Sequence, residues 1–505
     1  MPPPSPSVPG GSPKRRGWYA SLAIGILLVA FYQVENFRGE RAWKACRTEL
    51  MAKGEGLDWA EAIPPPVPDE SNFYSAPIVR SWIPNKSDTP SVAPLAGGLH
   101  DIVRAPRPNH DGDSLPLVPE FPSGYFPPGT YAMSDLKTLP AASPGDKPGA
   151  ESLAGLGEWI DQWAAGFDEL YQAAQRPEAR LEGSYADPIT RPVPGFVRVR
   201  TVAQLLATRA KVHLLQRKPD LAMRDMDTMH GLVRAMGAKP PTLVAAMIGV
   251  ALAGLYADVV QEGLAEGLWG TEQLAALPDR MATINLIPLA IGSLRVGERA
   301  AVLHLGDELT RLGLSSLADA RGPAQALQFG GLWLVIPRGW IRQNQVRYAQ
   351  LMQKLLEPYD AKTARLDPRR ADAVAGEIEH SVSGRSPFLL LCEVAVPNIT
   401  KALITAAKNQ TVLNQARIAC ALERHRMAQG GYPERLEGLV PAYLSSVPAD
   451  VLTGQPMIYR RTLEGKFVLY SIGWNLVDDG GKATGVPGDP DWVWLTSLRE
   501  PTPKK

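Results

Sequence analysis

Residues 17–34, GWYASLAIGILLVAFYQV, decide the organisation of this chain because no side chain among them is charged. An uncharged, mostly apolar run of about 18 residues is near the minimum that crosses the hydrocarbon core of a bilayer as a helix. The run lies between the basic cluster of residues 14–16 and Glu35. We therefore expect a transmembrane helix at residues 17–34, and this segment is the expected contact with the membrane.

The basic cluster also predicts an orientation. Lys and Arg close to a span favour the cytoplasmic side, so the N-terminus is expected inside and the rest of the chain outside the cytoplasm. For a bacterial cell this means a single-pass protein of the inner (cytoplasmic) membrane with a periplasmic body. A cleaved signal peptide would share the basic flank and the apolar run. Since the run ends in bulky Phe31 and Tyr32, with only a poor small-residue match at Leu28 and Ala30, an uncleaved anchor is favoured.

Composition limits the other possibilities. A chain of 505 residues suggests about three domains, and 45% hydrophobic residues suffice for a core. The formal charge is +1 and the basic residues are dispersed, which argues against a nucleic-acid partner. Cys46, Cys392 and Cys420 are too few for a disulfide framework. Cys392 and Cys420 either pair across helices or are small buried thiols.

The expected fold class is mainly α, with an N-terminal transmembrane helix, a helical-hairpin body and a small α+β unit at the end. The proline-rich tail cannot bury a core and should be disordered. Proline clusters such as 64–66 exclude long helices and central strands, while interspersed aromatic residues such as Phe73 indicate an extended arm packed on the body, with short edge strands. In chain order we expect a tail (1–16), the membrane helix (17–34), a juxtamembrane helix (35–62), the arm (63–150), the helical body (151–410) and the α+β unit (411–505).

Periodic apolar residues predict the helices of the body. Apolar positions recur every three or four residues in 202–214 and again in 221–236, which predicts two amphipathic helices joined by a turn at 218–220. A third run, 243–256, has Thr242 as a possible N-cap and is too short to cross a bilayer comfortably, so a buried helix is expected. Further helices are expected around 284–318, 340–357 and 386–428.

The helix pair at 201–236 resembles one tetratricopeptide-like unit, with small residues at Ala210 and Ala222. Helical hairpins of that kind are platforms for protein partners. No fixed period establishes an array, and a plain packed helical bundle explains the pattern equally well.

The C-terminal part has a distinct order of elements. An amphipathic helix at 411–429 is followed by Gly430-Gly431, and a hairpin of 457–461 with 466–472 surrounds Glu464-Gly465. A turn at 478–481, DDGG, and a final strand at 491–495 complete it.

This order resembles the globular part of type II secretion pseudopilins of the protein G-like kind. The likeness covers 411–505 and implies a helix followed by a small antiparallel sheet. Pseudopilins have their membrane helix directly before this domain and a glutamate where this chain has Leu22, so we expect the fold without assembly into a filament. The whole chain also resembles uncharacterised bacterial membrane-anchored proteins that end in SIGWN (471–475) and DWVW (491–494), which implies no activity.

The pseudopilin likeness implies one cofactor, calcium. Such proteins often bind it in the late loop, where this chain has hard carboxylate ligands of the kind Ca²⁺ prefers: Asp478, Asp479, Asp489 and Asp491. The alternative is a solvated acidic turn, since Asp and Gly are what turns select.

No motif identifies a reaction. The chain has no His-Glu-x-x-His, no Walker phosphate loop and no G-x-S-x-G elbow. His213, on an apolar helix face, is expected to be a core histidine. His304 and Asp307, one helical turn apart and just after Glu298-Arg299, either form a catalytic trio or belong to an ordinary polar face. Arg338, Gln343 and Asn344 either line a polar pocket or cap and solvate a helix.

Two function hypotheses remain. The first, which we favour, is a non-enzymatic envelope scaffold or protein-interaction module with protein partners, linked to secretion or pilus-like systems. The alternative is a membrane-anchored extracytoplasmic hydrolase whose active site lies unrecognised in the helical body.

Overall fold

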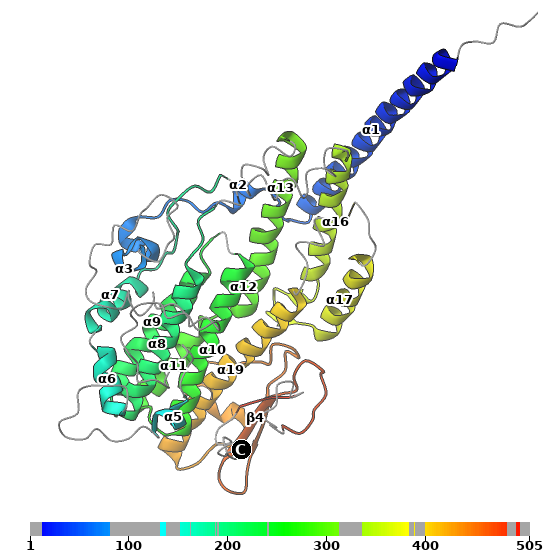
Figure 1. The fold of residues 1–505 in the computed structure, drawn as a ribbon. Helices are drawn as coiled ribbons and strands as arrows, with labels where there is room; N and C mark the ends of the chain where they lie inside the picture. Colours follow the sequence, from blue (N-terminus) through cyan, green and yellow to red (C-terminus); the bar gives the residue numbers. More distant parts are fainter. Residues whose placement is uncertain are drawn as a thin grey trace, which may run out of the picture. The chain divides into compact units, whose positions relative to one another are not determined.

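A computed structural model describes residues 13–80, 132–137, 152–161, 163–186, 188, 191–239, 242–312, 336–382, 388, 399–481 and 491–494. Over these ranges the protein is mainly helical (Figure 1), and an apolar helix stands near its N-terminus. The expected fold class is confirmed at this level. Contacts divide the chain into two compact units: the first contains Met1–Asp58, Ala300–Met352 and Ile378–Pro397, and the second contains Trp59–Arg299, Gln353–Glu377 and Asn398–Lys505.

Helix α1, Pro13–Ala52, is a single helix of 40 residues. It includes the expected membrane helix and the first part of the expected juxtamembrane helix (35–62), so the predicted boundary between residues 34 and 35 falls inside it. No proline or glycine pair interrupts the chain at that point, and Gly54 ends the helical segment with a positive φ of 79°. The helix ends at Ala52, and residues 53–58 are not helical before α2 (Trp59–Ala62) begins. Of the expected tail (1–16), residues 13–16 already belong to α1, and residues 1–12 lie outside the described residues.

The first unit is built from α1, most of α13 (Arg299–Leu312), the first part of α16 (Arg338–Leu356) and the end of α17 (Pro368–Val382). The second half of α1 has one buried stripe. Its members recur every three or four residues, as one face of a helix requires: Glu35, Gly39, Trp43, Cys46 and Leu50.

The second unit has the predicted helical hairpin at its centre. Helices α8 (Phe196–Leu215) and α9 (Pro219–Met236) pack along each other and are joined by a short turn in which Arg217 has a positive φ. Helix α10 (Leu243–Ala265) lies against both of them and against α12 (Leu286–Gly292) and α19 (Ile399–Gln429). Helix α11 (Thr271–Ala282) also packs on α9 and α19, and a π-helical turn, η3 (Ser293–Glu298), follows α12.

Helix α10 corrects one expectation. Thr242 is its N-cap as predicted, because its Oγ1 accepts a hydrogen bond from Ala245 N at 2.9 Å. The helix is 23 residues long, however, so the argument that it is too short to cross a bilayer was wrong. Its burial comes from packing instead: small residues at Gly249 and Ala253 allow neighbouring helices to approach, and Tyr256 is fully buried.

The described part of the proline-rich arm forms short helices in place of an extended segment. They are η1 (Asp69–Ser71), η2 (Phe73–Ser75), α3 (Pro77–Arg80) and α5 (Met133–Lys137). Helix α2 (Trp59–Ala62) lies just before the arm, within the expected juxtamembrane helix, and the body continues with α6 (Leu153–Asp161) and α7 (Ala164–Ala174). Phe73 and Tyr74 are buried, and Tyr74 Oη donates to Ala235 O at 3.2 Å. The arm therefore packs on the body as expected. In the described residues the expected edge strands are reduced to one parallel bridge, Asn72 to Glu178.

The C-terminal region follows the expected order. Helix α19 ends at Gln429 and Gly430 adopts φ 77°, after which come η4 (Leu436–Leu439) and an antiparallel sheet of β3 (Ile458–Arg461), β4 (Phe467–Ser471) and β5 (Trp492–Val493). Because α19 already begins at Ile399, the predicted boundary between 410 and 411 falls inside a helix. A small hairpin, β1 (Tyr359–Asp360) with β2 (Arg365–Leu366), was not predicted.

Candidate membrane anchor and its docking site

The side chains of α1 change environment abruptly at Glu35. In the first half large apolar side chains are exposed, with Leu27 at 69%, whereas Glu35 is 6% exposed. By length and composition three stretches of the described chain are long and apolar enough to cross a membrane, and only 6% of the α1 window is buried, against 56% for Leu243–Ala265 and 50% for Thr271–Arg311. The apolar side chains in the first half of α1 are therefore not covered by the described part of the protein.

Two glycines let α1 and α16 cross at backbone contact. A Cβ atom built on Gly39 would lie 2.1 Å from Gly339 O, and one built on Gly339 would lie 1.9 Å from Glu35 O. Neither helix can give way without moving its backbone, so no side chain fits at this crossing. Asn36 Oδ1 accepts a hydrogen bond from Gly339 N at 2.9 Å and fixes the register of the two helices.

Glu35 is a buried carboxylate that binds α16. It accepts hydrogen bonds from Arg38 at 2.6 Å, from Trp340 Nε1 at 2.9 Å and from Gln343 Nε2 at 3.3 Å. Burying a carboxylate is costly unless its oxygens are hydrogen-bonded. The contact is therefore specific, and it uses Gln343, one of the polar residues that the sequence suggested for a pocket.

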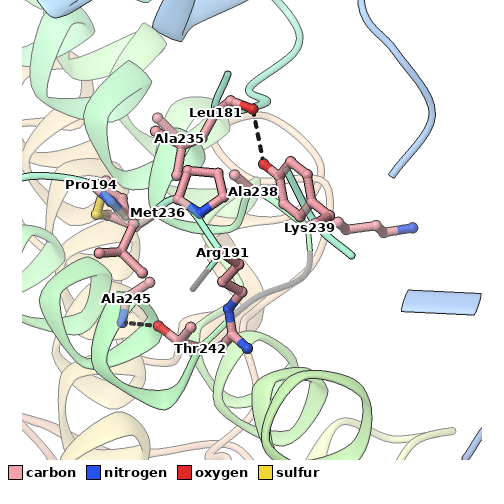
Figure 2. A pocket seen from close by; sticks show the side chains of 12 residues that line it. Leu181, Arg191, Pro194, Ala235, Met236, Ala238, Lys239, Thr242 and Ala245 are labelled. Atoms are coloured by element: carbon pink, nitrogen blue, oxygen red, sulfur yellow. Dashed lines mark hydrogen bonds between the residues drawn. The ribbon is translucent and has the colours of Figure 1, made fainter. Parts of the chain in front are cut away.

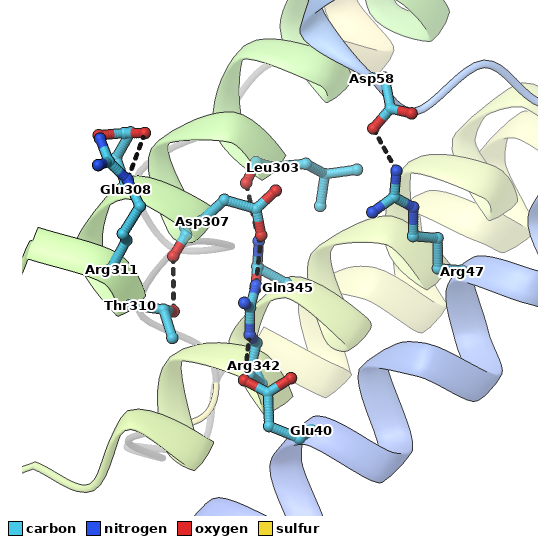
Figure 3. A network of polar contacts seen from close by, with 11 residues as sticks. Glu40, Arg47, Asp58, Leu303, Asp307, Glu308, Thr310, Arg311, Arg342 and Gln345 are labelled. Carbon is cyan, nitrogen blue, oxygen red and sulfur yellow. Dashed lines mark hydrogen bonds and ion pairs between the residues drawn. The ribbon is translucent and has the colours of Figure 1, made fainter.

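Arg342 joins α16 to α1 and α13, two of the other helices of this unit (Figure 3). Its guanidinium pairs with Glu40 of α1 at 2.8 Å and with Asp307 of α13. Gln345 extends the network to Leu303 O at 2.7 Å. Burial lowers the pKa of Arg342, but the hydrogen bonds to Glu40 and Asp307 outweigh it and raise the pKa overall, so the cation is retained.

Structural contacts also involve residues near His304 that the sequence suggested for a catalytic trio. Asp307 is bound by Arg342, and Glu298 Oε1 accepts the hydrogen bond of Leu243 N at 2.8 Å. Arg299 is fully buried and donates to Gln353 Oε1 at 3.2 Å. Glu298, Arg299 and Asp307 therefore each have a structural partner, and both alternatives for His304 stay predictions.

Polar clusters inside the second unit are also structural. His213 Nδ1 lies 3.0 Å from Asp225 Oδ2, and Arg209 donates to the same carboxylate at 3.0 Å, so His213 is a core histidine as expected. Burial raises the pKa of Asp225 against the lowering effect of these two partners.

Sequence reasoning missed a buried ion cluster in the second unit. Lys211 is fully buried, with its Nζ 2.6 Å from Asp258 and 3.4 Å from Glu262. Glu262 also accepts a hydrogen bond from Met133 N at 2.6 Å, which ties the arm to α10. Two carboxylates four residues apart on an otherwise apolar helix were the available signal.

A pocket lies between the segment 181–194 and the α9–α10 corner (Figure 2). Its cations are Arg191, stacked on Trp59 at 5.1 Å, and exposed Lys239. Tyr185 Oη donates to Leu181 O at 3.0 Å. None of the twelve described residues that line the pocket is His, Cys, Asp or Glu, so the pocket has no general base of those types.

The acidic loop near the C-terminus is organised by its own backbone. Asp491 accepts hydrogen bonds from Asp479 N at 3.1 Å and Gly481 N at 2.8 Å. Asp478 accepts from Tyr470 Oη at 2.9 Å, and Asp479 accepts from Asn475 Nδ2 at 3.1 Å. Asp489 lies outside the described residues, so the calcium site stays a prediction. Over the described ranges, no group of three or more His, Cys, Asp or Glu residues is placed to hold a metal ion.

Two of the three cysteines lie in the described part of the chain, and both are buried. Cys46 and Cys420 are buried free thiols, and burial raises the pKa of both. Cys392 lies outside the described residues. The buried-thiol alternative is confirmed for Cys420.

The chain matches no family model, no curated protein and no solved structure. Its function must therefore be argued from the geometry of the anchor and its docking site.

Proposed function

We propose that this protein is a single-pass, membrane-anchored scaffold whose body is held at the membrane surface by α1. The observation that carries the proposal is the change at Glu35, where a helix with exposed apolar side chains becomes one clamped by α16. Exposed apolar surface of this extent on a helix is unfavourable in water and favourable in a bilayer. In this proposal the first half of α1 crosses the bilayer, and the second half of the same helix binds α16.

Packing supports a single crossing. Helix α10 is apolar around its circumference and is covered by α8, α9, α12 and α19, as expected for a core helix. Its Asp258 and Glu262 bind a buried lysine inside the protein. In the stretch 271–311, half of the apolar window is buried inside the protein, against 6% for α1, which favours packing within the protein over a second span.

The basic cluster at 14–16 supports the orientation, with the N-terminus in the cytoplasm and the body outside it. In a bacterium this places the body in the periplasm, attached to the inner membrane.

We favour a scaffold over a hydrolase because several histidines are used structurally. His213 binds Asp225, His230 Nε2 lies 2.7 Å from Thr283 Oγ1, and His425 Nδ1 lies 2.8 Å from Gly431 O. The exposed start of α9 at Leu221 and the pseudopilin-like end are surfaces on which envelope proteins of a secretion or pilus-like system would dock.

The anchor is tested by extracting membranes at alkaline pH. The native chain should stay in the membrane pellet, and the double variant Leu27→Arg/Leu28→Arg should be lost from it, because each arginine at a span centre costs about 3 kcal/mol. Leu463→Arg is the matched control, since Leu463 is fully exposed in the turn between β3 and β4. Release of the native chain into the soluble fraction would refute the anchor.

The scaffold role is tested by photo-crosslinking in intact membranes. A crosslinking residue at Leu221, which is 42% exposed on α9, should give a reproducible adduct with a defined envelope protein. The same residue at Leu463 serves as the comparison. Recovery of the chain alone from both positions, together with turnover of a small ester by the purified protein, would favour the hydrolase.

A further inference from the structure

Aromatic side chains from three segments meet where α1 leaves its apolar half. The ring of Phe31 lies 6.3 Å from that of Trp340, and the ring of Phe388 lies 5.3 Å from Trp340, both edge to face. All three residues belong to the first unit. Phe31 is part of the uncharged run, so Trp340 of α16 packs on the end of that run, and Phe388 packs on Trp340.

The depth of this contact follows from helix geometry. Phe31 precedes Glu35 by four residues, which is roughly 6 Å along a helix that rises 1.5 Å per residue. The headgroup layer on each side of a bilayer is roughly 5–7 Å thick. A ring packed on Phe31, with its polar atom on Glu35, therefore lies within that layer.

Trp340 is oriented as interfacial tryptophans are. Its ring packs on Phe31, while Nε1 donates to Glu35 Oε2 at 2.9 Å. An aromatic residue with one apolar end and one polar end is favoured at the boundary between lipid tails and water.

Two exposed residues at the same level support a lipid environment. Phe37 is 68% exposed on α1 although it lies beyond the uncharged run, and it points about 200° around the helix from Glu35, away from α16. Arg338, the first residue of α16, is exposed and cationic. An exposed phenylalanine and an arginine near the end of a span suit a layer of phosphate headgroups.

We propose that Phe37, Arg338, Trp340 and Phe388 form a second membrane contact, here named the headgroup contact, which binds the phospholipid headgroups around α1. The partner is the bilayer surface itself. The inference rests on the proposed anchor and adds to it: α16 joins α1 as a second element that sets the depth of the first unit in the bilayer.

The test uses the full-length protein in nanodiscs of phosphatidylcholine with phosphatidylglycerol. A fluorescent amino acid is incorporated at Arg338, at Gly25 or at Met51, and quenching is compared between lipids spin-labelled at the headgroup and at mid-chain. Gly25 has no atom within 4 Å of an added Cβ, and Met51 is exposed on the same helix, roughly 24 Å beyond Glu35 at 1.5 Å per residue.

The expected pattern separates the two proposals. Position 338 should be quenched several-fold more by the headgroup label than by the mid-chain label, position 25 more by the mid-chain label, and position 51 by neither. Quenching at 25 without quenching at 338 would overturn the headgroup contact and leave the anchor standing. Absence of mid-chain quenching at 25 would overturn the anchor and the headgroup contact together.

Discussion

Single residues decide how closely the helices of this protein can approach, and Gly339 is the strictest case. A Cβ atom at this position would overlap the backbone of Glu35. We expect Gly339→Ala to lower the free energy of unfolding by about 1–3 kcal/mol, as overpacking does, measured by thermal denaturation in detergent. The control is Gly376→Ala in the interior of α17, where an added Cβ meets nothing within 4 Å, and alanine there should stabilise by about 0.5–1 kcal/mol. Equal effects of the two changes would argue against a tight crossing.

Lys211 is a fully buried cation that is paired with two carboxylates. Lys211→Met should lower the free energy of unfolding by about 3 kcal/mol, because Asp258 and Glu262 would lose their buried cation. Adding Glu262→Gln should recover part of that loss. Lys53→Met, at an exposed pair with Glu49 on α1, is the control and should have little effect. Denaturant titration gives all three values, and an unchanged midpoint for Lys211→Met would show that the cluster contributes nothing.

At the scale of elements, α1 has an exposed apolar half and a docked half, and the docked half depends on Arg342. Arg342→Ala removes the charged hydrogen bonds to Glu40 and Asp307. Because both carboxylates are partly exposed, we expect the two bonds together to contribute about 2 kcal/mol to the free energy of docking. We expect faster alkylation of Cys46, which is buried on the docked face and whose pKa burial raises. Arg311→Ala breaks an exposed pair with Glu308 on α13 and should leave the rate unchanged. If Cys46 reacts at the native rate in both variants, Arg342 does not hold α1.

Helix α10 depends on its first turn. Thr242→Ala should lower the free energy of unfolding by about 1 kcal/mol through loss of the N-cap, since Oγ1 holds Ala245 N. Thr242→Ser keeps the oxygen and should retain most of the stability. Thermal denaturation distinguishes the two, and equal losses would assign the effect to the lost methyl group.

For the whole molecule, the central question is how many times the chain crosses the membrane. Alkaline phosphatase fused after Lys239 and after Gly267, on either side of α10, should be active in both fusions if α10 is a core helix. A fusion after Arg16 should be inactive. Activity that differs between the fusions at 239 and 267 would show that α10 crosses the bilayer.

Local sequence patterns predicted those elements that are stabilised by residues close to one another along the chain. The α8–α9 hairpin, the Thr242 cap and the β3–β4 hairpin around Gly465 each follow from residues within one or two turns, because periodicity, capping and positive φ act over that range. The long apolar run likewise predicted an exposed helix near the N-terminus. Helix α17 was not predicted, although its buried apolar residues Ala371, Val374 and Ile378 recur at helical spacing.

Only the tertiary structure showed how α1 is held. Glu35 and Trp340 are 305 positions apart in the chain, and nothing in the sequence near either residue specifies the other. The same is true of Gly39 with Gly339, and of Lys211 with Asp258. Close backbone approach and the satisfaction of a buried charge depend on which helices become neighbours, and that choice is made by the packing of the whole core.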